Sequence, residues 1–176
     1  MDISWKSIRA AHVALLLFSL AIASCGFQLR GTTIDREWPP ALAQLQLKLD
    51  VSQSTVFERT LRDELAQVYR VQLLDNNAPV LAVSGVSRSR RVLSLSSTGK
   101  ASEYLLQFDA AFSVSDAAGK QLIASQRFRL QREFTVGTEN ILAKQAEEQR
   151  IYDEMQADAA RQLLRRVASQ MRDRAG

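Results

Sequence analysis

The chain has 176 residues, a formal net charge of +4, one cysteine and one histidine. A single cysteine excludes an internal disulfide, and one cysteine with one histidine supplies too few ligands for the usual zinc sites. The modest positive charge is compatible with an acidic partner, such as a phosphorylated lipid, and equally with an ordinary solvated surface.

The first 24 residues have the pattern of a secretory leader. Two basic residues precede an apolar run, 13–23, which has the length of a signal peptide and is too short to span a bilayer. The sequence Ile-Ala-Ser-Cys that ends at Cys25 is the lipobox pattern of bacterial lipoproteins, in which the cysteine thiol receives a diacylglycerol. We therefore predict that residues 1–24 are a cleaved signal peptide and that Cys25 carries the lipid anchor. The alternative is an ordinary cleaved leader followed by a stray cysteine.

Cleavage before Cys25 would leave 152 residues with a net charge of +3, enough for one domain with its own core. It would also remove His12, and acylation would occupy the thiol, so catalysis that needs histidine or cysteine is excluded. The chain has no glycine-rich phosphate loop, and its acidic residues at 139–158 follow a predicted helix, as on a solvated face. The sequence therefore predicts no catalytic residue, no metal and no cofactor. Nucleic acid is not expected as a partner of an exported protein.

The mature chain begins with an irregular segment and a strand. Residues 25–40 form a lipidated lead-in that ends at Trp38-Pro39-Pro40, a sequence that interrupts regular structure. Leucines then alternate with polar residues over 44–49. This period of two predicts a strand with one buried face.

An amphipathic helix is predicted next. Thr55 and Glu58 fit a capping box, and the helical pattern continues to about residue 70. A short extended piece, 71–74, then leads into a turn at 75–79. The apolar positions of the helix are Phe57, Leu61, Leu65 and either Val68 or Tyr69.

Three long strands follow. The first covers about 80–96, and Gly85 within it indicates a bulge or a bend. The second is an uninterrupted alternation of apolar and polar residues over 104–114. Turn sequences at 96–100 and 116–120 join the three strands as antiparallel hairpins. The third strand is expected to turn Leu122, Ala124, Phe128, Leu130, Phe134 and Val136 to one face.

The period becomes helical over about 140–172. An apolar stripe on this helix faces the core, and arginines concentrate towards its C-terminal end. We expect one domain over 41–172, a tail over 173–176 and an α+β fold in the order β-α-β-β-β-α. Two helices would cover one face of a four-stranded, mainly antiparallel sheet, whose other face stays polar. The stripe consists of Tyr152, Met155, Ala159, Ala160, Leu163, Leu164 and Val167.

Four short stretches of the mature chain resemble the LptE family, the lipopolysaccharide-assembly lipoproteins of the Gram-negative outer membrane. The first is Cys-Gly-Phe-Gln-Leu-Arg at 25–30, and the second is the turn and strand start Gly-Lys-Ala-Ser-Glu-Tyr at 99–104. The others are Leu-Ala-Lys-Gln at 142–145 and the spacing Ala-x-x-Leu-Leu near 160–164. The resemblance covers the mature chain in the same order of elements.

The resemblance implies a protein that is not an enzyme. In that family the lipoprotein forms a one-to-one complex with the LptD β-barrel, assists its assembly, plugs its lumen and binds lipopolysaccharide on its way to the cell surface. The protein would then be anchored to the outer membrane, on the periplasmic side and within the barrel lumen. Gly26 after the cysteine agrees with sorting to that membrane.

The resemblance also implies where lipopolysaccharide binds. Basic residues in the turn before the Glu-Tyr strand and near the start of the last helix are implicated in the family. The second position corresponds to Lys144, whereas Ser97 stands at the first, so that Lys100 and Arg91 are the basic candidates nearby. If these fail, Arg88 and Arg90 are the next candidates.

A second function remains open. The chain could be a lipoprotein that faces the periplasm and binds a small ligand or inhibits an enzyme. That function predicts an apolar pocket between sheet and helices and a stable free monomer, whereas an LptE-like function predicts a constitutive complex with a barrel.

Overall fold

The computed structural model describes residues 38–50, 55–136 and 141–175. The chain divides into two units, 1–32 and 33–176, and all described residues belong to the second. The predicted leader and the predicted anchor at Cys25 lie outside the described residues.

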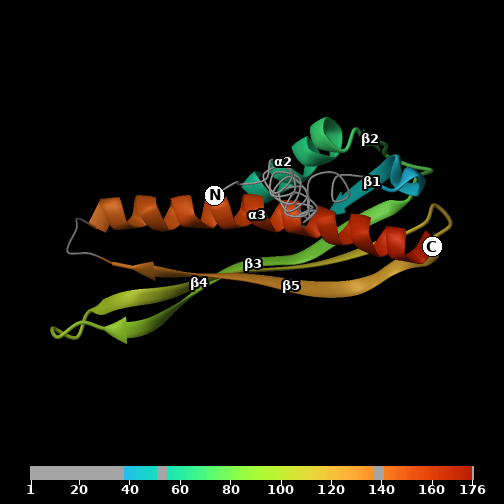
Figure 1. The fold of residues 1–176 in the computed structure, drawn as a ribbon. Helices are drawn as coiled ribbons and strands as arrows, with labels where there is room; N and C mark the ends of the chain where they lie inside the picture. Colours follow the sequence, from blue (N-terminus) through green and yellow to red (C-terminus); the bar gives the residue numbers. More distant parts are fainter. Residues whose placement is uncertain (1–37, 51–54, 137–140, 176) are drawn as a thin grey trace, which may run out of the picture. The chain divides into compact units, whose positions relative to one another are not determined.

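The described residues of this unit form five strands, a short α-helix and a long α-helix, together with two short helical turns (Figure 1). In chain order its elements are the 3-10 turn Pro40–Leu42, β1 Gln44–Leu49, α2 Thr55–Asp63, a π-helical turn Glu64–Val68, β2 Gln72–Leu73, β3 Val80–Leu95, β4 Ala101–Ser115, β5 Gln121–Thr135 and α3 Ile141–Ala175.

The sheet has five strands in the order β2-β1-β3-β4-β5, so the prediction of four strands is wrong by one. The additional strand, β2, is the short extended piece predicted at 71–74. Its two residues pair in parallel with β1, and β1 also pairs in parallel with β3. The sheet is therefore mixed, because a helix, α2, joins β1 to β2 and returns the chain in the same direction. The long strands β3, β4 and β5 are antiparallel, as predicted.

The first helix ends in a widened turn. The backbone N–H of Tyr69 donates to the carbonyl of Glu64 at 3.0 Å, and Arg70 has a positive φ of 55°. Such a left-handed residue commonly ends a helix. Val68 is exposed, whereas Tyr69 packs against Trp38 with their ring centroids 4.9 Å apart, which decides between the two predicted inward positions. The predicted capping box depends on the side chain of Thr55, which lies outside the described side chains.

A bulge interrupts the pairing of β3 with β4 at Gly85. Ser84 pairs with Ala111 and Ser87 pairs with Asp109, so two residues of β3 lie opposite one residue of β4. Gly85 has a φ of 62°, a conformation that side chains with a Cβ rarely adopt. The bulge predicted from this glycine is therefore confirmed.

A second bulge changes which side chains of β5 are buried. Val114 pairs with Ile123 and Phe112 pairs with Gln126, which leaves two residues of β5 opposite Ser113. Beyond this bulge Phe128 and Phe134 are buried, as predicted, but before it Ile123 is buried and Ala124 is exposed. The predicted inward position of Ala124 is wrong, because an extra residue reverses the alternation of faces.

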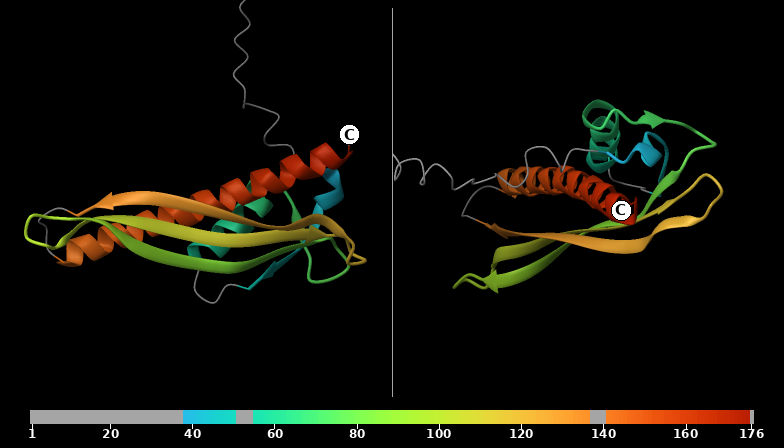
Figure 2. Two further views of the ribbon diagram at one scale, coloured as in Figure 1. Left: turned by 90° about the horizontal axis from the view of Figure 1, so that it is seen from below. Right: turned by 45° about the vertical axis from the view of Figure 1, so that its right-hand side comes forward.

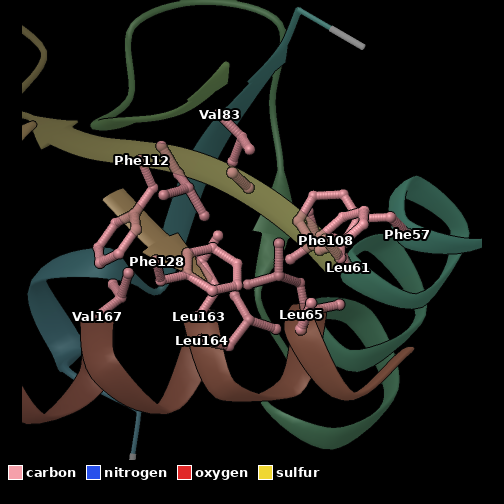
Figure 3. Close-up of a cluster of buried hydrophobic side chains, with 14 of the residues drawn as sticks. Phe57, Leu61, Leu65, Val83, Phe108, Phe112, Phe128, Leu163, Leu164 and Val167 are labelled. Atoms are coloured by element: carbon pink, nitrogen blue, oxygen red, sulfur yellow. The ribbon is translucent and has the colours of Figure 1, made fainter. Parts of the chain in front are cut away.

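Both helices lie on the same side of the sheet (Figure 2). The core fills the space between them and the inward face of β4, on which every second residue from Tyr104 to Val114 is buried. Phe57 of α2 packs against Phe108 with ring centroids 5.3 Å apart. Burial of each such side chain stabilises the fold by about 1.5–3 kcal/mol. The predicted stripe of α3 is buried throughout and meets Phe112 and Phe128 (Figure 3).

Candidate functional site

Lys144, the first predicted lipopolysaccharide-binding residue, lies near the start of α3 and against the sheet. Its Nζ donates a hydrogen bond to the Tyr104 hydroxyl of β4 at 3.1 Å and lies 4.6 Å from the centroid of the Tyr104 ring. The side chain is half-buried and has no carboxylate partner among the described residues. The positive charge of Lys144 is thus held in place without being neutralised by an ion pair.

A second cation, Arg90 of β3, contacts the same tyrosine. The guanidinium carbon of Arg90 lies 4.8 Å from the centroid of the Tyr104 ring, and a nitrogen of that group pairs with Glu148 of α3 at 2.6 Å. The hydrogen bond to Glu148 raises the pKa of Arg90 above its ordinary value. Cations attract the electron-rich face of an aromatic ring, so Tyr104 joins α3 to β3 through two charged side chains.

Further contacts along α3 hold this arrangement. The hydroxyl of Tyr152 donates to the carbonyl of Ser89 at 2.7 Å, and Arg88 lies 5.2 Å from the centroid of the Tyr152 ring. Burial is the main cause of a raised pKa for Tyr152, so its hydroxyl stays protonated and can donate. These contacts fix the register of α3 relative to β3.

An open cleft of about 800 Å³ adjoins Lys144, between the end of β5 and the first turns of α3. Apolar side chains, among them Phe134, Val136 and Ile151, line part of it. Glu147 and Arg150 also line it and form an ion pair with each other. The hydrogen bond from Arg150 lowers the pKa of Glu147. Glu133 of β5 lines the cleft as well, so its lining contains two acidic and two basic side chains. Lys144 supplies an ammonium that has no ion pair among the described residues, beside a partly apolar surface.

The other two predicted binding residues lie elsewhere. Lys100 is exposed in the β3–β4 turn, four residues before Tyr104, which corresponds to about 13 Å along an extended strand. Arg91 pairs with Leu105, whereas its neighbour Arg90 pairs with Leu106, which is fully buried. Since successive side chains of a strand point to opposite faces, Arg91 lies on the outer face of the sheet. The structure does not bring Lys100 or Arg91 together with Lys144.

Sequence reasoning missed the central role of Tyr104 and placed Arg90 only among reserve candidates. A signal for Tyr104 was present, because the Glu-Tyr pair is part of the second stretch that resembles the LptE family. Ser97 lies in the exposed turn with Lys100. Cys25 lies outside the described residues.

Comparison with known proteins decides the family. The model of the LptE lipopolysaccharide-assembly family matches residues 42–167 of the chain. The chain belongs to this family.

Named relatives agree with LptE membership. The LPS-assembly lipoprotein LptE of Photorhabdus laumondii is 32% identical over 162 residues, which cover 89% of this chain and 85% of that protein. That of Yersinia enterocolitica is 30% identical over 163 residues, with 89% of this chain and 75% of that protein covered. Both are named as assembly lipoproteins rather than as enzymes. LptE membership supports a role in lipopolysaccharide assembly and transport.

Solved structures share the LptE-like fold. The crystal structure of the rare lipoprotein B of Shewanella oneidensis has a TM-score of 0.67 and 28% identity, over 76% of this chain and 99% of that one. A lipoprotein B of Nitrosomonas europaea, solved by NMR, has a TM-score of 0.65 and 28% identity, over 82% of this chain and 91% of that one. The predicted α+β class with two helices is thereby confirmed.

Two properties of the described residues bear on the site. Within the part of the chain that the structure describes, no helix combines the length and the apolar character needed to cross a bilayer. The same residues contain no cluster of three or more acidic, histidine or cysteine side chains that could hold a metal ion.

The alternative, small-ligand function predicts an apolar pocket between the sheet and the helices. In the described residues this layer contains tightly packed side chains such as Phe108, Phe112 and Leu163, each almost or fully inaccessible to solvent (Figure 3). The cleft beside Lys144 is open and lies at the end of β5.

Proposed function

We propose that the protein is an outer-membrane lipoprotein, anchored through Cys25, that helps to assemble an LptD-type β-barrel, occupies its lumen and binds lipopolysaccharide for delivery to the cell surface. Membership of the LptE family supports the assembly role. The observation that carries the binding role is the ammonium of Lys144, held by Tyr104 and without an ion pair among the described residues, beside a partly apolar cleft.

The chemistry of that site suits an amphiphilic anion. Lipid A carries phosphate groups next to acyl chains, and a lysine ammonium binds phosphate as a point charge. Lys144 lies within the first turns of α3, where the positive end of the helix dipole adds to the attraction. Lys100 and Arg91 remain proposed contacts for more distant parts of the same large ligand. They would act separately from Lys144, because the structure does not bring the three side chains together.

The binding role is tested with the full-length lipoprotein in detergent and with fluorescently labelled lipopolysaccharide. We expect Lys144→Asp to weaken binding about tenfold or more at low salt, since it replaces an attraction by a repulsion. Lys120→Asp is the matched control, because Lys120 is an exposed lysine in the β4–β5 turn, at the other end of β4. Equal affinities for Lys144→Asp and wild type would rule out this site.

The barrel role needs a separate measurement. We expect the wild-type protein to co-purify with a β-barrel from detergent-solubilised outer membranes, and Lys144→Asp to do so equally well. A protein that is recovered only as a free monomer would contradict the barrel role and favour the small-ligand alternative.

The anchor is tested by the intact mass of the mature protein. We expect the chain to begin at Cys25 with added acyl mass. Cys25→Ala should release the protein from the membrane fraction, whereas an unmodified thiol on a membrane-bound wild-type protein would exclude the proposed anchor.

A further inference from the structure

The outer face of the sheet carries a polar hollow that the proposed lipopolysaccharide site does not use. Its volume is about 460 Å³, and it includes residues of the β3 bulge, which lies opposite Ala110, and of the β5 bulge, which lies opposite Ser113. Small residues form its floor and sides, and two arginines stand at its edge; those used below are Ser84, Gly85, Ser87, Ser125, Arg127 and Arg129.

The space above Gly85, at the bulge of β3, is free of neighbouring side chains. No atom lies within 4 Å of the position that a Cβ on Gly85 would occupy. Ser84, Ala111 and Arg127 are direct neighbours across the three strands, as are Ser87, Asp109 and Arg129. In each of these two rows across the sheet, shorter side chains on β3 and β4 are followed by an arginine on β5.

The charges of the hollow do not balance. Arg129 donates a hydrogen bond to Asp109 at 2.7 Å, and Gln107 donates another to the same carboxylate. Arg127 makes no side-chain hydrogen bond and no salt bridge with any residue that the structure describes, although its charge also acts on Asp109 from a greater distance. After Asp109 and Arg129 neutralise each other, one positive charge remains, on a group with five N–H donors.

We propose that this hollow receives a carboxylate from a protein partner that docks on the outer face of the sheet. A planar guanidinium binds a carboxylate through two parallel hydrogen bonds, and the serine hydroxyls around it can donate more. One unbalanced positive charge matches one monoanion, and the second negative charge of a phosphate dianion would add to the repulsion from Asp109. The side-chain ladder of Gln107 and Gln131 beside the hollow offers further hydrogen bonds to a protein surface.

The inference rests on the proposed function only for the identity of the partner, which would be the wall of the barrel lumen. The acidic side chain itself is recognised by this chain's own residues. One measurement therefore tests whether the hollow binds a carboxylate, and a second tests whether this face docks on the barrel.

The first measurement uses the ¹⁵N-labelled full-length lipoprotein in detergent micelles at low salt. The probes are acetyl-Gly-Glu-Gly-amide, its glutamine counterpart and inorganic phosphate. We expect only the glutamate peptide to shift the backbone amides of 84–87 and 125–127 in a saturable way. Arg127→Gln should abolish these shifts, and Arg165→Gln, at an exposed arginine of α3, should preserve them. Absence of the shifts, or stronger shifts with phosphate than with the peptide, would overturn the inference.

The second measurement is recovery of the barrel from solubilised outer membranes. We expect Arg127→Glu to reduce recovery at least about threefold relative to Arg165→Glu. The new glutamate would face the carboxylate of the partner and repel it. Unchanged recovery with Arg127→Glu contradicts the docking face but leaves the proposed function intact. If the wild type recovers no barrel, the proposed function fails, and the peptide titration alone decides the inference.

Discussion

The Nζ of Lys144 and the hydroxyl of Tyr104 are 3.1 Å apart, although forty residues separate them in the sequence. The contact links the first turns of α3 to the central long strand of the sheet. It orients the ammonium and leaves it without a carboxylate partner among the described residues. Tyr104 is therefore a positioning residue for the proposed lipopolysaccharide site.

Tyr104→Phe tests this positioning role. The substitution removes the hydroxyl that accepts from Lys144 but keeps the ring that attracts both cations. We expect lipopolysaccharide affinity to fall about threefold, with the midpoint of urea unfolding nearly unchanged.

The control for this prediction is a double-mutant cycle with Lys144→Asp. If Tyr104 acts through Lys144, adding Tyr104→Phe to Lys144→Asp should cause no further loss of affinity. Additive losses would mean that Tyr104 binds the ligand independently.

The middle of β4 carries the largest expected stability effect. Phe108 is fully buried between the sheet and Phe57 of α2, so Phe108→Ala should lower the free energy of unfolding by about 3–5 kcal/mol. Gln131→Ala, on the exposed face of β5, should change it by no more than about 0.5 kcal/mol. Both are measured by urea unfolding, and similar losses at the two positions would show that the faces are wrongly assigned.

Gly85 allows a distinction between crowding and backbone strain. A Cβ at this position meets no neighbour within 4 Å, so any cost of substitution arises from its φ of 62°. We expect Gly85→Ala to lower the free energy of unfolding by about 1–2 kcal/mol and Gly85→Asn by less, because asparagine adopts this conformation more readily. Equal costs for the two variants would contradict the strain explanation.

The sequence was sufficient to predict the elements whose hydrophobic period is uninterrupted. The alternation over 104–114 and the stripe of α3 are buried as expected, since burial of these elements depends only on their period. The sequence predicts β2 only as an extended piece and not as a strand of the sheet. Two residues are too few to show a hydrophobic period, and they become a strand only through pairing with β1. Gly85 marked one bulge in the sequence, whereas the bulge of β5 contains no glycine and left no comparable signal.

The site was predictable to a smaller extent. Lys144 was named from a resemblance, and its position near the start of α3 is confirmed. Its contacts with Tyr104 depend on how α3 packs against β4, and the approach of Arg90 to the same ring depends on the register of β3 against β4. That register includes the bulge at Gly85, and a sequence pattern does not specify how many residues a bulge adds. Arg91 is a candidate only as a basic residue that compensates for Ser97 in the neighbouring turn, and the structure places it on the outer face of the sheet.

Asp109 provides a prediction on acid stability. Partial burial acts to raise the pKa of its carboxyl, but hydrogen bonds from Arg129 and Gln107 and the charge of Arg127 outweigh it, so the pKa lies below its ordinary value of 3.8. A carboxylate with a lowered pKa in the folded state stabilises the protein above about pH 4, and this contribution is lost as the pH falls through its folded pKa.

Asp109→Asn should therefore be less stable than wild type at pH 7, and the difference should shrink below pH 4. Because the ion pair is largely exposed, the difference should be small and should decrease in high salt. Urea unfolding at pH 7 and pH 3, with and without salt, measures both effects, and a difference that grows towards pH 3 would contradict the assignment.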